Sequence, residues 1–106
     1  MATNITDENY KEEIENSDQP VLLDVYADWC PPCQQMSPIF AQLEKKHGDK
    51  YKFAKLNVDN AREISIKLGI SSIPTFVFIK NGKIVAKETG YRSEDDMEEL
   101  IKDNLE

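Results

Sequence analysis

The chain contains two cysteines, Cys30 and Cys33, which lie three positions apart with two prolines between them. Two thiols at this spacing could contribute to a zinc site, form a structural bridge or exchange disulfides with another protein. A zinc site needs about four ligands, and the chain offers no further cysteine and one histidine, His47. A bridge closing so short a loop would constrain the unfolded chain by only about 2 kcal/mol. The spacing therefore favours a redox-active dithiol.

The expected position of the pair supports this chemistry. Residues three apart at the start of a helix can bring their Cα atoms within the roughly 4.4–6.8 Å that a disulfide requires. The positive end of the helix dipole favours a thiolate on the first cysteine. We expect Cys30 to be the attacking sulfur and Cys33, deeper in the helix, to resolve the mixed disulfide.

The elements on either side of the pair must hold it in place. Residues 21–27 (VLLDVYA) are apolar in both alternating sets except at Asp24, which predicts a strand buried on both faces. Apolar side chains at helical spacing follow, at Met36, Ile39, Phe40 and Leu43. They predict a helix that ends at Gly48, is kinked at Pro38 and carries His47 as a cation near its C-terminus.

The remaining patterns predict an α/β domain. We expect a first helix from Thr6 or Asp7 to about Asn16, a strand over 51–59, a helix over 61–69, a hairpin at Asn81-Gly82 and a last helix capped by Ser93. A short strand around Asn4 and Ile5 is an option. Helices that alternate with buried strands predict a central mixed sheet with helices on both faces and a C-terminal hairpin plus helix. The acidic residues of the last helix are interpreted as its solvated face.

Size and charge restrict the functional classes. A chain of 106 residues is expected to form a single domain over 1–106. Its net charge of −7 argues against nucleic acid and anionic membranes as partners, because both need a basic surface. No apolar run reaches the roughly 20 residues that span a bilayer, and no signal peptide is recognised. We therefore expect a cytoplasmic protein.

Several stretches in order resemble one known family. The segment VLLDVYADWCPPCQQMSP is similar to the active-site strand and helix of the thioredoxin family, and AKLNVDN, GISSIPTFVFIKNG and ETGYRS follow with the family's spacing. The resemblance covers the whole chain. It implies the thioredoxin fold and a protein-disulfide reductase that works through a mixed disulfide.

The resemblance implies a role for each of four residues. Cys30 would be the nucleophile and Cys33 the resolving thiol. Asp24 would be a buried carboxylate that exchanges a proton with Cys33, and Lys55 would be the partner of Asp24. A carboxylate inside a buried strand is costly unless it is paired or protonated. The alternative is an Asp24–Lys55 ion pair without a kinetic role.

The resemblance also implies a substrate-binding rim around Cys30, formed by Trp29, Pro31, Ile73, Pro74 and Gly90. The Ile73–Pro74 bond matches the family's cis-proline, although base rates alone favour a trans bond. Ile73 would then offer its backbone to an extended substrate segment. The alternatives are that Pro74 only opens the next strand and that Trp29 only fills the core.

Partners and cofactors follow from the same resemblance. It implies disulfide-containing protein substrates, no bound cofactor or metal, and recycling by a thioredoxin reductase that uses NADPH. A monomer is expected. One alternative is a thiol oxidant or isomerase on the same fold, which the missing leader and Ile73 disfavour. Another is a thioredoxin-like binding subunit without redox activity.

The chain departs from the family pattern at two positions beside the dithiol. Pro31 stands where glycine is common, and Gln34 where lysine is frequent. Because a residue before proline avoids the helical region, we expect the helix to begin at about Pro32. The Cys30 thiolate then lacks two N–H donors and relies on the N–H of Cys33. Proline also stiffens the loop, which lowers the entropy lost on closing the disulfide, so the two effects on the reduction potential oppose each other.

Overall fold

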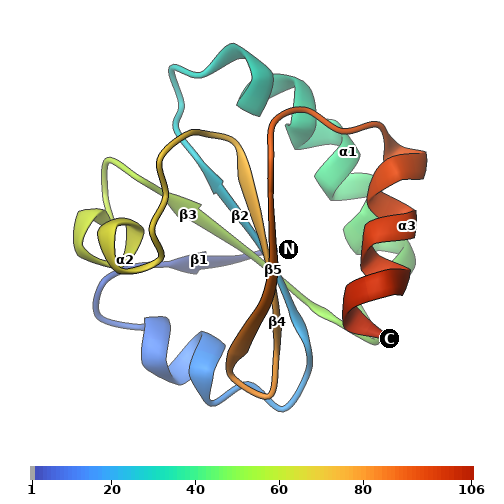
Figure 1. The fold of residues 1–106 in the computed structure, drawn as a ribbon, viewed down its shortest axis with the longest axis horizontal. Coiled ribbons are helices and arrows are strands. Elements are labelled where there is room, and N and C mark those ends of the chain that lie inside the picture. Colours follow the sequence, from blue (N-terminus) through green and yellow to red (C-terminus); the bar gives the residue numbers. More distant parts are fainter. Residues whose placement is uncertain (1) are drawn as a thin grey trace.

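The centre of the molecule is a five-stranded mixed sheet, seen in a computed structural model that describes residues 2–106 (Figure 1). Its strands are β1 (Thr3–Ile5), β2 (Val21–Tyr26), β3 (Lys52–Asn57), β4 (Thr75–Lys80) and β5 (Lys83–Thr89). They lie in the order β1-β3-β2-β4-β5, so β1 and β5 form the edges. The pairs β1–β3 and β3–β2 are parallel, whereas β2–β4 and β4–β5 are antiparallel. The expected mixed sheet is therefore confirmed.

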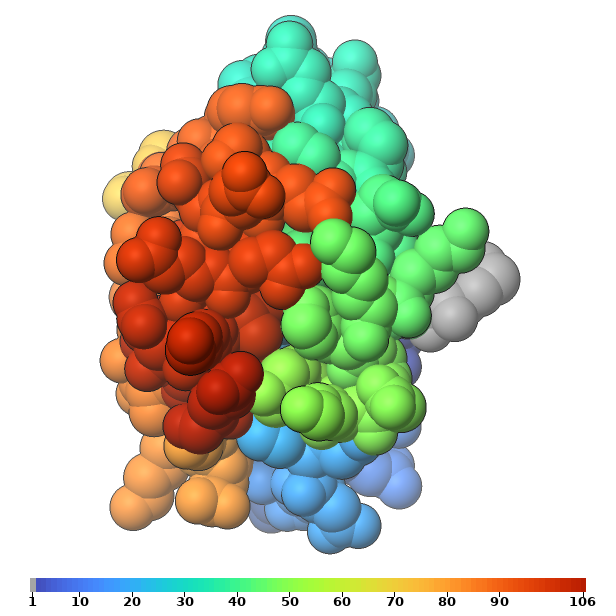
Figure 2. Space-filling model, turned by 90° about the vertical axis from the view of Figure 1, so that its right-hand side faces the viewer, coloured from blue at the N-terminus to red at the C-terminus, as the bar shows by residue number. Residues whose placement is uncertain are grey.

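Helices cover both faces of the sheet. The helical segment η1 (Lys11–Glu15) and helix α2 (Arg62–Lys67) lie on one face, and α1 (Pro31–His47) and α3 (Glu94–Leu105) lie on the other (Figure 1). Figure 2 shows α3, in orange to red, alongside α1, in cyan to green. Within residues 2–106, no helix is long and apolar enough to cross a bilayer.

Strand β2 contributes to two separate hydrophobic cores. Val21, Leu23 and Val25 are fully buried on the face of η1 and α2, while Leu22 is buried on the face of α1 and α3. The strand is thus apolar on both sides because both sides are covered. Asp24 shares the alternation of Leu22, which places a carboxyl group on the α1 side of the central strand.

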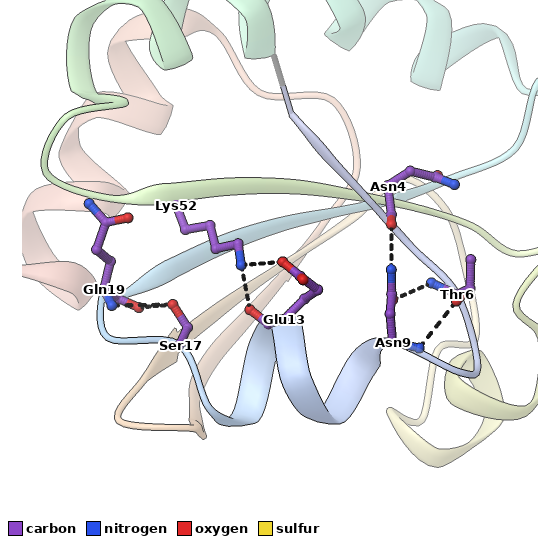
Figure 3. Close-up of polar contacts among 7 residues, drawn as sticks. All are labelled: Asn4, Thr6, Asn9, Glu13, Ser17, Gln19 and Lys52. Atoms are coloured by element: carbon purple, nitrogen blue, oxygen red, sulfur yellow. Dashed lines mark hydrogen bonds and ion pairs between the residues drawn. The ribbon is translucent and has the colours of Figure 1, made fainter.

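The first helical segment is shorter than expected. Its N-cap is Tyr10, which makes no side-chain cap, so neither Thr6 nor Asp7 caps it as expected. A turn precedes it instead, in which the Thr6 hydroxyl accepts a hydrogen bond from the Asn9 N–H (3.2 Å) and the Asn9 side-chain oxygen accepts one from the Thr6 N–H (2.8 Å; Figure 3). The segment spans Lys11–Glu15 and has the wide hydrogen bonding of a π-helix, with the Asn16 N–H donating to the Lys11 carbonyl at 3.0 Å. A reciprocal side-chain turn therefore does not by itself determine where the helix begins or which hydrogen-bond pattern it has.

The segment is attached to the sheet by an ion pair. Lys52 of β3 lies 2.6 Å from the Glu13 carboxylate and donates a further hydrogen bond to the Glu13 carbonyl at 2.9 Å (Figure 3). Ser17 then closes the turn into β2, because its hydroxyl donates to the carbonyl of Gln19 at 2.9 Å. The contact between Lys52 and Glu13 joins residues 39 positions apart and cannot be predicted from local sequence patterns.

Helix α1 begins one residue earlier than expected, at Pro31 rather than Pro32. Cys30 is its N-cap with an extended backbone (φ −95°, ψ 109°), and its carbonyl accepts the first helical bond from the Gln34 N–H at 3.1 Å. Proline already has the φ of a helix, and the first helical positions have no intrahelical use for their N–H groups. These two factors outweigh the preference against helix before a proline. The helix continues through Pro38.

The last helix matches its sequence pattern. The Ser93 hydroxyl accepts a hydrogen bond from the Asp96 N–H at 3.1 Å, as the capping motif predicted. The buried stripe consists of Met97, Ile101 and Leu105. The acidic face is not simply solvated, however, because two of its carboxylates bind the end of α1. Lys46 lies 2.7 Å from Glu94 and 3.3 Å from Glu98, and His47 lies 2.5 Å from Glu98.

The hairpin between β4 and β5 has the predicted type I′ turn. Both of its central residues have a positive φ, 54° at Asn81 and 77° at Gly82. A Cβ atom at Gly82 would lie 2.6 Å from the backbone carbonyl oxygen of Glu15. Glycine is therefore required both by the turn and by close contact with the end of η1.

This contact predicts an unequal effect of substitution at the two turn positions. Gly82→Ala should lower the free energy of unfolding by about 2 kcal/mol or more, because it adds left-handed strain and a clash. Asn81→Gly is the matched control and should change stability by less than about 1 kcal/mol. Urea unfolding of the three proteins measures both values. Equal stability of the two variants would contradict the assigned role of Gly82.

Candidate active site

Three connections of the chain meet at one end of the sheet, where β2 and β5 end and β4 begins. Because β4 is antiparallel to β2 and to β5, the end of β2, the start of β4 and the end of β5 lie together, at the upper end of the sheet in Figure 1. The Cys30 sulfur lies 3.9 Å from the Ile73 carbonyl oxygen, and the Gly90 N–H donates to the Pro74 carbonyl at 2.8 Å. Strand direction thus brings together residues that are distant in the sequence.

The two cysteines form a disulfide at the start of α1. Their Cα atoms are 5.2 Å apart, and both residues are buried. The Cys33 N–H points at the Cys30 sulfur, with 3.3 Å between nitrogen and sulfur. Since Pro31 and Pro32 carry no N–H group, this amide is the donor that the first turn of α1 directs at the reactive sulfur.

Asp24 lies inside the central strand with 1% of its surface exposed. Its Oδ1 atom has no hydrogen-bond partner in the described chain. Burial raises the pKa of this carboxyl from the ordinary 3.8 to about 7, and the nearby charge of Lys55 acts in the opposite direction. Asp24 can therefore hold or release a proton near neutral pH.

Lys55 is the register partner of Asp24 across the parallel pair β2–β3. Within residues 2–106, however, no ion pair joins the two side chains, and the Lys55 ammonium lies 4.6 Å from the centre of the Tyr26 ring. A cavity of about 190 Å³ borders Lys55 and Tyr26, and it is lined by Tyr26, Ala27, Asp28, Cys33, Gln34, Ser37 and Lys55.

The outer surface near Cys30 is partly apolar. Trp29 is 66% exposed and its indole N–H donates to the Asp59 carboxylate at 2.9 Å, so it does not fill the core. Pro31 is exposed and Ile73 is half-buried.

Pro74 and Gly90 follow Ile73 in the chain of contacts that starts at Cys30. Pro74 is buried, and the Ile73–Pro74 peptide bond is cis. Gly90 has a φ of 95°, and no atom of residues 2–106 outside its chain neighbours lies within 4 Å of where its Cβ would stand. Contacts given above join Cys30 to Ile73 and Pro74 to Gly90.

Sequence reasoning missed two residues of this region, Asp59 and Tyr26. Asp59 follows β3 and holds Trp29, a contact across 30 positions for which the sequence carries no signal. Tyr26 carries a weak signal, because it lies two positions after Asp24 on the same strand and so faces the same side. His47 belongs to the far end of α1, where it pairs with Glu98.

Comparisons with known proteins place the chain among close relatives. The family model described as Thioredoxin matches residues 1–103. The chain is 40% identical over 105 residues to a thioredoxin of Rickettsia bellii (strain RML369-C), covering 99% of this chain and 100% of that protein. It is 39% identical over 102 residues to a thioredoxin of Alicyclobacillus acidocaldarius, with 96% of each chain covered. For a thioredoxin of Bacillus subtilis (strain 168) the values are 35% over 100 residues and 94% of each chain.

The raised pKa of Asp24 predicts a stability cost at higher pH. The folded protein binds this proton more tightly than the unfolded chain, so the stabilisation that Asp24 contributes is fully present below about pH 4 and is lost as pH rises to about 7. The difference between a pKa of 3.8 and one of about 7 corresponds to a contribution on the order of 4 kcal/mol. Asp24→Asn should therefore be more stable than the parent at pH 8 and nearly equal at pH 4. Urea unfolding across this range tests the sign, and parallel curves would contradict it.

Proposed function

The chain belongs to the thioredoxin family, and from that membership we propose how its cysteine pair reduces other proteins. Members of this family are protein-disulfide oxidoreductases, and the Cys30–Cys33 pair at disulfide distance makes this chain one of them. The observation that carries the assignment is the disulfide at the N-cap of α1, where a backbone amide already points at the first sulfur.

The reaction begins from the reduced form. The Cys30 thiolate attacks one sulfur of the target disulfide, a new sulfur–sulfur bond forms, and the old bond breaks to release a target thiolate, which takes up a proton. The Cys33 thiol then loses its proton and attacks the Cys30 sulfur. This second exchange closes the Cys30–Cys33 disulfide and releases the other target thiol. Two electrons pass from the dithiol to the target.

Asp24 is the proposed acceptor of the proton from Cys33. Its pKa of about 7 suits a group that must take up a proton in one step and release it in another. The cavity that borders Cys33 and Lys55 supports a water-mediated transfer. Lys55, whose charge lowers the Asp24 pKa, is the proposed partner that keeps the carboxylate accessible.

The rim around Cys30 is the proposed substrate-binding surface, formed by Trp29, Pro31, Ile73, Pro74 and Gly90. The Ile73 carbonyl lies 3.9 Å from the Cys30 sulfur, where it can meet the backbone of an extended substrate segment. The open space over Gly90 leaves room for that segment. Exposed Trp29 and Pro31 provide apolar contacts at the margin.

The proposed setting is that of a cytoplasmic, monomeric electron carrier. Its substrates are disulfide-containing proteins, and its oxidised form returns to the dithiol by means of a thioredoxin reductase that draws electrons from NADPH. No bound cofactor takes part in the exchange. The acidic surface, with a net charge of −7, disfavours nucleic acids and anionic membranes as partners.

Single cysteine variants test the order of the two exchanges. Cys33→Ser should accumulate a covalent complex with a disulfide-containing protein such as insulin, because the mixed disulfide forms but is not resolved. Cys30→Ser should form no such complex and should lose turnover with NADPH and thioredoxin reductase. Non-reducing electrophoresis and NADPH oxidation measure the two effects.

The double variant separates this function from a binding role. Cys30→Ser combined with Cys33→Ser keeps the rim but removes both sulfurs, so it should be inactive in turnover. Full activity of the double variant in cells would support a binding subunit instead. A covalent complex formed by Cys30→Ser alone would show that the assigned order is reversed.

A variant at Pro31 tests the effect of the missing amide. Pro31→Gly restores an N–H group beside the Cys30 sulfur, which should stabilise the thiolate and raise the rate of its alkylation at pH 6 up to about tenfold. The reduction potential measured in a glutathione buffer should differ between the two proteins. It should also lie nearer to the value of about −270 mV known for thioredoxin than to about −120 mV, typical of a strong oxidant. Identical potentials and alkylation rates would refute a role for Pro31.

A further inference from the structure

Tyr26 is the last residue of β2 and faces the same side of the sheet as Asp24. The Lys55 ammonium lies above its ring, 4.6 Å from the ring centre. A cation at this distance from an aromatic face is attracted by the negative potential of the ring. The Tyr26 ring therefore attracts the ammonium of Lys55, the residue that the β2–β3 register places opposite Asp24.

Within residues 2–106, the carboxyl of Asp24 forms no ion pair with the Lys55 ammonium. Its Oδ1 atom is buried and has no hydrogen-bond partner among residues 2–106, although Lys55 is its register partner on the adjacent strand. A lysine side chain on the neighbouring strand is long and flexible enough to approach a cross-strand carboxylate. Something else must therefore hold the ammonium group, and the ring of Tyr26 is the contact that the structure offers.

We infer that Tyr26 is a positioning residue for the dithiol chemistry: its ring holds the Lys55 ammonium at the cavity beside Cys33 and away from direct contact with Asp24. The inference rests on the proposed role of Asp24 as proton acceptor. A direct ion pair would fix Asp24 as a carboxylate, whereas a cation held at the ring leaves both protonation states accessible.

The surroundings of the three groups are consistent with this assignment. Asp28, from the connection after β2, and Cys33, from α1, line the same cavity as Tyr26 and Lys55. From β4, the apolar Phe76 lies in register opposite Asp24. Burial, with the charges of Asp28 and Asp24, raises the pKa of Tyr26 and outweighs the opposite effect of its Asn57 hydrogen bond. The phenol stays neutral at neutral pH, so its attraction for Lys55 comes from the ring face.

Two substitutions at position 26 separate the ring from the hydroxyl. Tyr26→Leu removes the aromatic face and frees Lys55 to approach Asp24, whereas Tyr26→Phe keeps the face and is the matched control. We expect Tyr26→Leu to lower the pKa of Asp24 by about 1 unit, and Tyr26→Phe to leave it within about 0.3 unit. Carbon-13 NMR titration of the Asp24 carboxyl in the oxidised protein measures this without any turnover.

A double-variant cycle distinguishes positioning from a change in burial. In a Lys55→Met background, Tyr26→Leu should leave the Asp24 titration unchanged, because no cation remains to be released. The inference is overturned if Tyr26→Leu produces no shift, if Tyr26→Phe produces the same shift, or if the shift persists without Lys55. Tyr26 is partly exposed, so Leu at this position is compatible with folding.

A separate measurement tests the proposed function on which the inference rests. The pH profile of disulfide reduction by Asp24→Asn should lose the inflection near pH 7 that the parent shows. Should that profile be unchanged, the proton-acceptor role of Asp24 and the catalytic use of Tyr26 both fall. The NMR titration still decides whether the Tyr26 ring holds Lys55, so the two failures are distinguishable.

Discussion

The reversal of strand direction between β2 and β4 determines where the chemical groups of this molecule lie. Strands β1, β3 and β2 are parallel, so all three end on the same side of the sheet. Strand β4 is antiparallel to them and begins on that side, and β5 ends there. Cys30, the Ile73–Pro74 bond and Gly90 meet there for this reason. The same central strand carries Asp24, and its carboxyl is buried because helices cover both faces of the sheet.

In the proposed mechanism, the two prolines influence the sulfur of Cys30, whereas the buried carboxyl of Asp24 serves the sulfur of Cys33. Pro31 and Pro32 leave the first turn of α1 with one amide directed at Cys30, so the helix end supports the thiolate through a single hydrogen bond. Asp24 is buried in β2, and the cavity of about 190 Å³ is lined by Cys33 and Lys55. The proposed mechanism thus places the nucleophile, Cys30, and the resolving thiol, Cys33, on one helix and under separate influences.

Sequence patterns predicted those features that depend on local chemistry. Asn81-Gly82 specified the hairpin, Ser93 the last helix, and the two-sided apolar pattern of residues 21–27 the central strand. The errors lie where local preferences leave more than one outcome open. Pro31 starts α1 because helical φ outweighs the restriction before proline, and the expected caps of the first helix, Thr6 and Asp7, lie before η1 and not at its N-cap. The contacts of Trp29 with Asp59 and of Lys55 with Tyr26 join separate elements, and no pattern within one element encodes them.

Strand β5 is an edge of the sheet, and its outer row of backbone amides and carbonyls is left without a neighbouring strand. Ile84 and Val85 are exposed on this strand, which makes it a template to which an additional strand could add. Lys83 is exposed on the same strand, whereas the Lys87 ammonium donates to the Leu68 carbonyl at 2.8 Å. A charged side chain on an edge strand opposes edge-to-edge pairing, so Lys83 disfavours the addition of a second copy at this edge.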